Sequence, residues 1–235
     1  WLRRTWAALR IQHAGTPAGE LAALASRLGG AADYQALVER VDLELSERNR
    51  LRLGADEPVE LRVALKNVPR LLVRIFRINT VNHVLAYGRD IDGALDLDGL
   101  VPNRQFELEY AQPPQVRHDE RIAIPDCAGP GTWVVELIGR GVSSRAIIRK
   151  GALQASWRIG AAGQVVTIRD AAGRELPDAV LLLGGREFRR AAGDDGVILP
   201  FTAQPGQASA LLVHGDVATP WSFSQLDERY TLDAS

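Results

Sequence analysis

Cysteine, methionine and lysine are almost missing from this sequence of 235 residues, which has one Cys, no Met, and Lys only at positions 66 and 150. The single thiol, Cys127, excludes an intrachain disulfide framework and a multi-cysteine metal site. It lies beside Asp126 and shortly before a Gly-Pro turn, a setting that predicts an unreactive side chain. The redox compartment therefore stays undetermined.

An excess of charge is also missing, since 28 basic and 29 acidic residues give a formal net charge of −1. Such a chain has no strong positive electrostatic potential that would attract nucleic acid or an anionic membrane. No window approaches about 18 uninterrupted apolar residues, the length of a membrane-spanning helix. We therefore expect no nucleic-acid partner and no direct insertion into a membrane.

The beginning of the sequence, WLRRTWAALRIQ, has neither the apolar region nor the small-residue cleavage site of a signal peptide. Its first residue already stands in a helical pattern. This predicts a piece cut from a longer polypeptide, whose signals for export or anchoring lie outside the sequence.

The stretch from Thr132 to Trp157 organises the chain. Apolar residues fill both parities from Trp133 to Ile138, which predicts a strand covered on both faces. Gly139 and Gly141 then bracket a turn, a second strand follows, and Gly151 ends it. One β-domain lies before Gly151 and another after it. The predicted fold is mainly β, with an α-helical N-terminal segment and tandem antiparallel β-sandwiches.

Residues 1–52 form the predicted helical segment. Leu2, Trp6, Leu9 and His13 share one helical stripe, and a second short helix follows Thr16-Pro17 and stops at Gly29-Gly30. A third helix begins near Asp33 and places five apolar residues on one face: Tyr34, Leu37, Val38, Val41 and Leu45. These stripes need a partner surface.

Residues 53–150 form the first predicted sandwich, because the apolar period changes from 3.6 to 2 near Leu51. A hairpin over residues 59–78 is followed by a polar loop from Asn79 to Gly99. Strands around residues 106–110, 122–124 and 133–148 come next. Without helices between them, such strands favour an antiparallel sandwich over a βαβ fold.

Residues 151–235 form the second predicted sandwich, with about seven short strands. Leu153, Ala155 and Trp157 share one strand face, and Trp133 and Trp157 are expected in the core. The last strand is expected around Tyr230 and Leu232. The other four strands are expected at 165–168, 179–183, 197–199 and 210–213, with Phe188 at the end of a neighbouring one.

The segment VTIRDAAGRELPDAV at residues 166–180, followed by DGVILPF at 195–201, resembles the macroglobulin-type and transthyretin-like β-sandwiches of alpha-2-macroglobulin-like proteins. The resemblance covers chiefly residues 151–235 and more loosely 55–150. It implies domains of a large multidomain protein. The family's thioester motif, Gly-Cys-Gly-Glu-Gln, is missing, because Cys127 stands in Asp-Cys-Ala-Gly; covalent trapping would belong to another part of such a protein.

Several motifs suggest chemistry that their spacing does not support. Asp90-Ile91-Asp92-Gly93 and Asp96-Leu97-Asp98-Gly99 place glycine fourth rather than sixth, so Asp-Gly turns are favoured over a calcium loop. Gly139-Arg140-Gly141 lacks the third glycine of a dinucleotide loop. A hydrolase using Ser143 or Ser144 with His118 or His214 stays the enzymatic alternative, although no Gly-x-Ser-x-Gly elbow is present.

Two groups of residues are candidates for interaction. Asn79, Asn82 and His83 lie in the polar loop after a strong strand, and loops at sandwich ends carry function in such folds. Trp221 and Phe223 follow Pro220 and are expected to be exposed, where they would stack on a ligand or dock on a neighbouring domain.

No catalytic residue, metal or cofactor is predicted. We expect a non-catalytic structural and interaction segment of a larger protein, with an extracytoplasmic location (periplasmic, cell-surface or secreted) favoured. Its partners would be neighbouring domains of the same polypeptide or another protein. A carbohydrate- or peptide-binding module is the competing interpretation.

Overall fold

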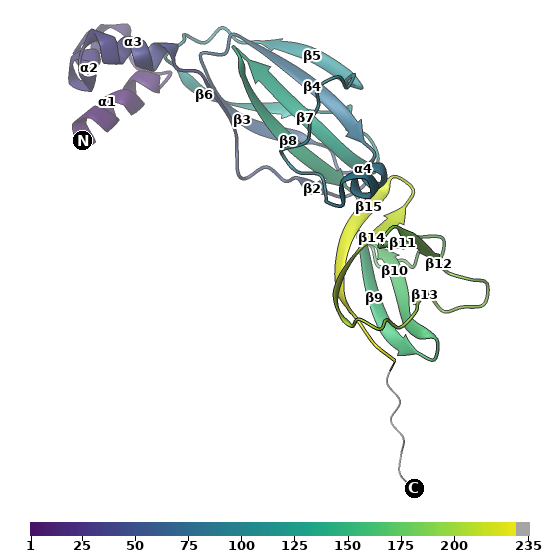
Figure 1. Cartoon of the computed structure of the whole chain (residues 1–235). Coiled ribbons are helices and arrows are strands. Elements are labelled where there is room, and N and C mark those ends of the chain that lie inside the picture. Colours follow the sequence, from purple (N-terminus) through teal and green to yellow (C-terminus); the bar gives the residue numbers. More distant parts are fainter. Residues whose placement is uncertain (229–235) are drawn as a thin grey trace.

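The computed structural model describes residues 1–228. Figure 1 shows an elongated chain in which a group of helices is followed by two β-sandwiches. This mainly-β, immunoglobulin-like architecture with N-terminal helices confirms the predicted fold class. The helices are α1 (Leu2–Gln12), η1 (Ala18–Glu20), α2 (Leu21–Leu28), α3 (Ala31–Glu39) and α4 (Thr80–Tyr87).

The first sandwich packs a sheet in the order β1-β3-β6 against a sheet in the order β2-β8-β7-β4-β5. Its strands are β1 (Asp42–Leu45), β2 (Arg52–Leu53), β3 (Glu60–Lys66), β4 (Arg70–Ile78), β5 (Arg104–Glu109), β6 (Arg117–Ala123), β7 (Gly131–Gly139) and β8 (Val142–Lys150). Strand β7 is buried along both faces, as the double parity of its apolar residues predicts, and Trp133 lies in the core. Arg140 and Gly141 take positive φ of 47° and 80° in the turn after it.

The second sandwich packs the order β13-β10-β9 against the order β12-β11-β14-β15. Its strands are β9 (Leu153–Gly160), β10 (Gly163–Asp170), β11 (Val180–Leu183), β12 (Arg186–Arg189), β13 (Val197–Leu199), β14 (Gly206–His214) and β15 (Val217–Gln225). The expected strand at Tyr230 and Leu232 lies outside the described residues. The last strand of the described part is β15, which the sequence pattern missed.

The two sandwiches repeat one topology. In chain order β1, β3 and β6 correspond to β9, β10 and β13, while β4, β5, β7 and β8 correspond to β11, β12, β14 and β15. Within residues 1–228, β2 has no counterpart in the second sandwich. That short strand pairs in parallel with the end of β8.

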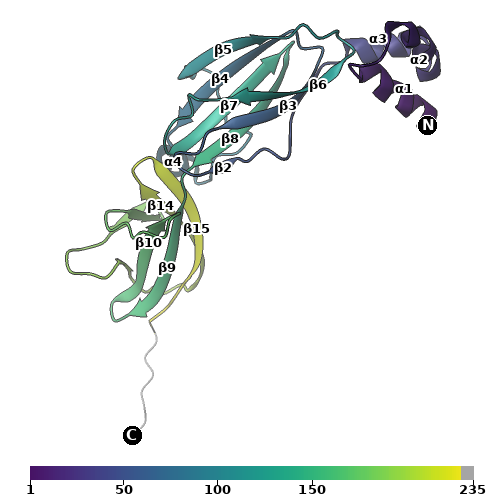
Figure 2. The same ribbon diagram turned by 180° about the vertical axis from the view of Figure 1, so that it is seen from behind.

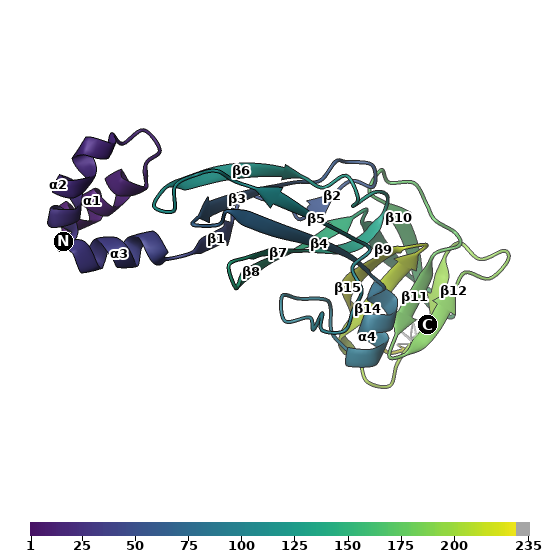
Figure 3. The same cartoon turned by 90° about the horizontal axis from the view of Figure 1, so that it is seen from above.

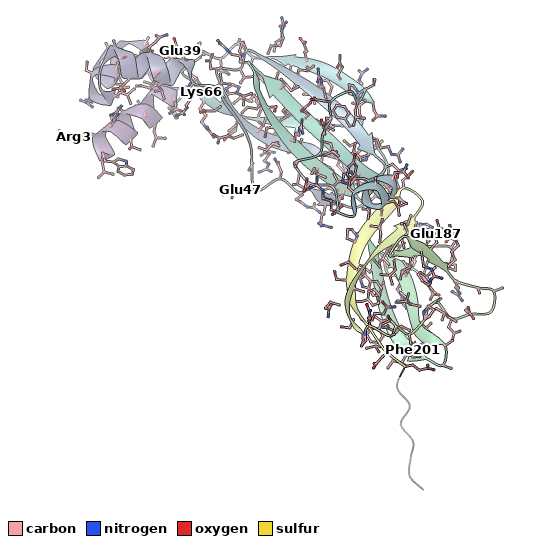
Figure 4. The ribbon with its side chains drawn as sticks, viewed as in Figure 1. Arg3, Glu39, Glu47, Lys66, Glu187 and Phe201 are labelled. Carbon is pink, nitrogen blue, oxygen red and sulfur yellow. The ribbon has the colours of Figure 1, made fainter. Side chains whose placement is uncertain are left out.

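The third helix is shorter than predicted, and this corrects the sequence interpretation. It ends at Glu39, and the residues expected to continue it form β1, which pairs with β3. The reason is a cap supplied by the β3–β4 turn: Lys66 Nζ donates to the Arg40 carbonyl at 2.6 Å, and Asn67 Nδ2 donates to the Glu39 carbonyl at 2.9 Å. Figure 4 labels Lys66 and Glu39 at this junction.

The helices form a core of their own, in which Ala7, Ile11, Leu24, Leu28 and Leu37 are buried. The opposite face of α1 carries the predicted stripe of Leu2, Trp6 and Leu9, and it is exposed. Within residues 1–228 Arg27 lies over the Trp6 ring, 5.8 Å from its centroid, yet Trp6 stays 51% exposed.

Candidate functional site

Catalytic and metal-binding arrangements are not found in the described residues. Ser143 and Ser144 lie on β8, whereas His118 lies on β6 and His214 at the end of β14 in the other sandwich, so the structure does not bring the hydrolase residues together. Residues 1–228 contain no group of three His, Cys, Asp or Glu side chains placed to hold a metal. No helix in this range is both long and apolar enough to cross a bilayer.

The Asp-Gly segments form turns. Asp92 Oδ1 accepts a hydrogen bond from the Ala94 amide, and Asp96 Oδ1 accepts one from the Asp98 amide, both at 2.9 Å. Cys127 is buried, and burial raises the pKa of its thiol to about 12. Asp92 and Asp96 therefore stabilise turns, and Cys127 is part of the core.

The most developed contact surface is the joint between the two sandwiches, and helix α4 is its first component. The predicted polar loop from Asn79 to Gly99 contains this helix, so the loop assignment was wrong. Asn79 caps it, because its Oδ1 accepts a hydrogen bond from the Asn82 amide at 2.9 Å, and Gly88 ends it at φ 68°. The cap, the glycine and the apolar spacing of Val81 and Val84 are the signals that sequence reasoning overlooked.

Helix α4 belongs to the first sandwich by sequence but packs on the second. Figure 3 shows α4 beside β11 and β14. Val81 and Val84 pack against buried residues on the outer face of the β12-β11-β14-β15 sheet. That face carries four buried apolar residues: Val180, Leu182, Leu211 and Ala218. Because this second apolar face is covered by α4, the second sandwich is buried on both sides of β11 and β14.

The second component is the β14–β15 hairpin, whose tip reaches the end of the first sandwich. There Arg77 donates a hydrogen bond to Asp216 Oδ2 at 2.7 Å and another to the Pro130 carbonyl at 3.2 Å. The guanidinium also lies over the ring of Trp133, 5.3 Å from its centroid. Arg77 therefore joins the core tryptophan of the first sandwich to the hairpin of the second.

Small residues let the two sandwiches approach closely. Within the first sandwich, Thr80 Oγ1 of α4 and Thr132 Oγ1 of β7 share a buried hydrogen bond of 2.8 Å, which holds the helix close to the joint. A Cβ added to Gly151 would lie 3.1 Å from Val217 Cγ2, and Gly151 has a φ of +79° that favours glycine. The predicted boundary glycine is thus held against β15 and is not part of a loose linker.

The predicted interaction residues of α4 border a hollow of about 400 Å³ at this joint, which Asn79 and Asn82 line together with Arg77, Thr132 and Asp216. His83 is half-buried, and its ring lies 4.8 Å from that of Tyr87. The structure brings Asn79 and Asn82 to the joint, but their role in binding stays a prediction. Sequence reasoning missed Arg77 and Asp216, because no local pattern relates residues 139 positions apart.

Trp221 and Phe223 were expected to be exposed, but Trp221 is half-buried and Phe223 is buried. Their rings stack at a centroid distance of 4.4 Å and an angle of 7°, and Phe223 is only 5% exposed within the second core. Both lie on β15, where alternate residues face inward. Trp157 shows the opposite error: it was expected in the core and is 36% exposed.

Comparison with known proteins extends the description of the fold. Residues 71–151 match the family described as AbpF first immunoglobulin-like domain. The chain is 32% identical over 206 residues to "Actin-binding protein F" of Dictyostelium discoideum, an alignment that covers 84% of this chain and 9% of that protein. The chain therefore spans a small part of the length of this relative.

Two solved structures are also similar. A crystal structure of Escherichia coli alpha-2-macroglobulin spanning domains MG0-NIE-MG1 shares 14% identity over 77% of this chain and 64% of that chain, with a TM-score of 0.48. A chimeric titin Z1Z2 tandem shares 16% identity over 80% of this chain and all of that chain, with a TM-score of 0.34. The family model supports an immunoglobulin-like sandwich over residues 71–151, and no single family is shown for the chain.

The expected extracytoplasmic location is wrong. The relative is named for binding actin, a cytoskeletal protein, and this points away from export. The expectation rested on a resemblance of turn motifs, which many β-sandwiches share whatever their compartment.

Proposed function

We propose that this chain is a rigid, non-catalytic tandem module that spaces and orients interaction surfaces within a larger protein. Its parts would be a helical segment, a first sandwich and a second sandwich meeting near Gly151. If β1 is counted with the first sandwich, the boundary proposed at residue 52 would lie at about residue 41 instead. The partners would be neighbouring domains and another protein, with actin the first to test because of the relative's name.

The observation that carries the proposal is that each sandwich contributes one element to the joint. Helix α4 extends from the first sandwich onto an apolar face of the second, while the β14–β15 hairpin extends from the second onto the first. Interfaces that bury apolar surface from both partners resist relative domain motion, whereas a linker alone permits it. A spacer that transmits orientation needs this property.

Small-angle X-ray scattering of the whole chain tests the proposal. The Val84→Asp variant places a charge against the covered face, whereas Leu85→Asp on the same helix changes an exposed residue and serves as control. We expect Val84→Asp to broaden the distribution of interatomic distances derived from the scattering curve, with both sandwiches still folded. Leu85→Asp should leave that distribution unchanged. Unchanged scattering by a folded Val84→Asp protein would refute the rigid joint.

Co-sedimentation with filamentous actin tests the partner separately. Saturable pelleting of the chain would support actin as the partner. Pelleting that does not rise above that of a protein of equal size and charge would remove actin and leave the spacer role to the scattering result.

A further inference from the structure

One side of the second sandwich is left open. Among the strands of residues 1–228, β9 pairs only with β10 and β15 only with β14, so both are edge strands. They lie on the same side of the sandwich, where β9 contacts β15 (Figure 2). In the first sandwich the equivalent side is partly closed by β2, and the described residues supply no such strand here.

Apolar side chains are exposed at this open side. Trp157 lies opposite Val166 and Ile159 lies opposite Gln164, and both of those β10 residues are fully buried. Directly opposed residues share a face, so Trp157 and Ile159 belong to the inner face of the sheet. They are nevertheless 36% and 64% exposed, because none of the strands described in residues 1–228 lies beyond β9. Trp221, half-buried on β15, lies on the facing inner surface.

The backbone of β9 is also available for pairing. Gly160 and Gly163 close a two-residue hairpin, and such closing pairs exchange both hydrogen bonds. Bonded pairs then alternate along an antiparallel ladder, which directs the amides of Ala155, Trp157 and Ile159 to the open edge. The Leu153 amide follows the same parity and donates outward, to Thr219 Oγ1 at 3.1 Å.

Strand β9 carries few of the devices that normally protect an edge, and its one charged residue is Arg158. It contains no proline and no lysine over eight residues, whereas the neighbouring edge strand β15 contains Pro220. The open side therefore favours strand addition to β9 rather than to β15.

Charge indicates what such a strand would carry. The Arg169 guanidinium donates to Ser156 Oγ at 3.0 Å, so it lies over β9 on the outer face of the sheet. Within residues 1–228 its side chain has no carboxylate partner. The nearby Arg158 pairs with Asp195 at an exposed site. An added strand would thus meet apolar groups on one face and, on the other, Arg169, whose cross-strand neighbour Glu175 pairs with Arg190 at 2.7 Å instead.

We propose that the β9 edge docks an extended segment of a partner protein in which apolar and acidic residues alternate. The segment would extend the β13-β10-β9 sheet by one strand, with its apolar residues over Trp157, Ile159 and Trp221 and its carboxylates toward Arg169. This site is separate from the joint and does not depend on the proposed spacer role.

The test is an NMR titration of the whole ¹⁵N-labelled chain with a capped eight-residue peptide in which valine alternates with glutamate. We expect saturable shifts confined to β9 and to the indole N–H groups of Trp157 and Trp221. Ile159→Lys and Arg169→Glu should each weaken binding about ten-fold, as should a peptide with lysine in place of glutamate. Val142→Lys, at an exposed apolar residue on β8 of the other sandwich, should leave binding unchanged.

Three results would overturn the proposal. One is the absence of shifts in β9 at millimolar peptide, and another is equal binding of the lysine peptide. The third is self-association through β9, seen as shifts that depend on protein concentration and not on peptide, which would make a second copy of the chain the occupant. None of these outcomes alters the scattering test of the joint, so the two proposals fail separately.

Discussion

Arg77, at the end of β4 in the first sandwich, and Asp216, at the tip of the β14–β15 hairpin in the second, form a hydrogen-bonded ion pair of 2.7 Å. Both side chains are substantially exposed, so Coulomb attraction alone contributes little to stability. The same guanidinium lies over Trp133 and bonds the Pro130 carbonyl, and these contacts fix its position. The pair therefore acts on orientation more than on folding.

Arg77→Ala should lower the free energy of unfolding by about 1–2 kcal/mol, because it removes the exposed pair, worth about 0.2–1 kcal/mol, together with the cation–π contact to Trp133, worth about 0.5–1 kcal/mol. A double-mutant cycle with Asp216→Ala in urea should give a coupling energy in the range of the exposed pair alone. Arg121→Ala, which removes an exposed pair of 4.0 Å with Glu60, is the control. Additive effects of Arg77→Ala and Asp216→Ala would show that the contact carries no energy.

Asn67 tests the cap that ends α3. Its φ is +55°, and its side chain bonds both the Glu39 carbonyl and Arg140. Asn67→Ala should destabilise the chain by about 2 kcal/mol, the sum of a left-handed backbone and a lost buried hydrogen bond. Asn67→Gly relieves the backbone and should lose about half as much. Equal losses in urea unfolding would assign the whole effect to the side chain.

Alkaline pH should destabilise the first sandwich. Burial raises the pKa of Cys127 from 9.0 to about 12 and that of Tyr110 from 10.0 to about 12. Between about pH 9 and 12 the unfolded chain therefore binds fewer protons than the folded one, and stability falls as pH rises. Each group contributes at most about 1.4 kcal/mol per pH unit.

Cys127→Ala removes the contribution of the thiol to the pH dependence of stability. The free energy of unfolding of this variant should therefore decline less steeply between about pH 9 and 10 than that of the unchanged chain. Urea unfolding at pH 7, 9 and 10 measures both slopes. The substitution also lowers stability equally at all pH values through the lost packing, and only the slopes are compared. Identical slopes would contradict the assignment.

Local apolar patterns predicted secondary structure correctly where the pattern fits a strand or a helix, but not both. The double parity of Trp133 to Ile138 permits only a doubly covered strand, and the structure has one there. The segment from Val41 to Leu45 fits helical spacing and strand alternation equally well. Its state is decided by Lys66 and Asn67, which end α3 from a distant turn.

Burial was less predictable than secondary structure, because it depends on which strands lie at an edge. Trp157 and Phe223 both alternate as core residues do, yet Trp157 stands on an uncovered edge and Phe223 lies inside the core. Pro220 concealed β15, since a proline inside a strand is tolerated only at an edge. The joint depends on contacts between distant segments, and no local period encodes them.

The most direct test of the rigid joint is a distance distribution between spin labels at Arg121 and Glu187, exposed positions on β6 and β12. A Cys127→Ala background keeps labelling specific to the two introduced cysteines. Pulsed electron paramagnetic resonance should give one narrow distribution for this protein and a broad one after Val84→Asp. A broad distribution without Val84→Asp would contradict the account, because the two sandwiches would then move independently.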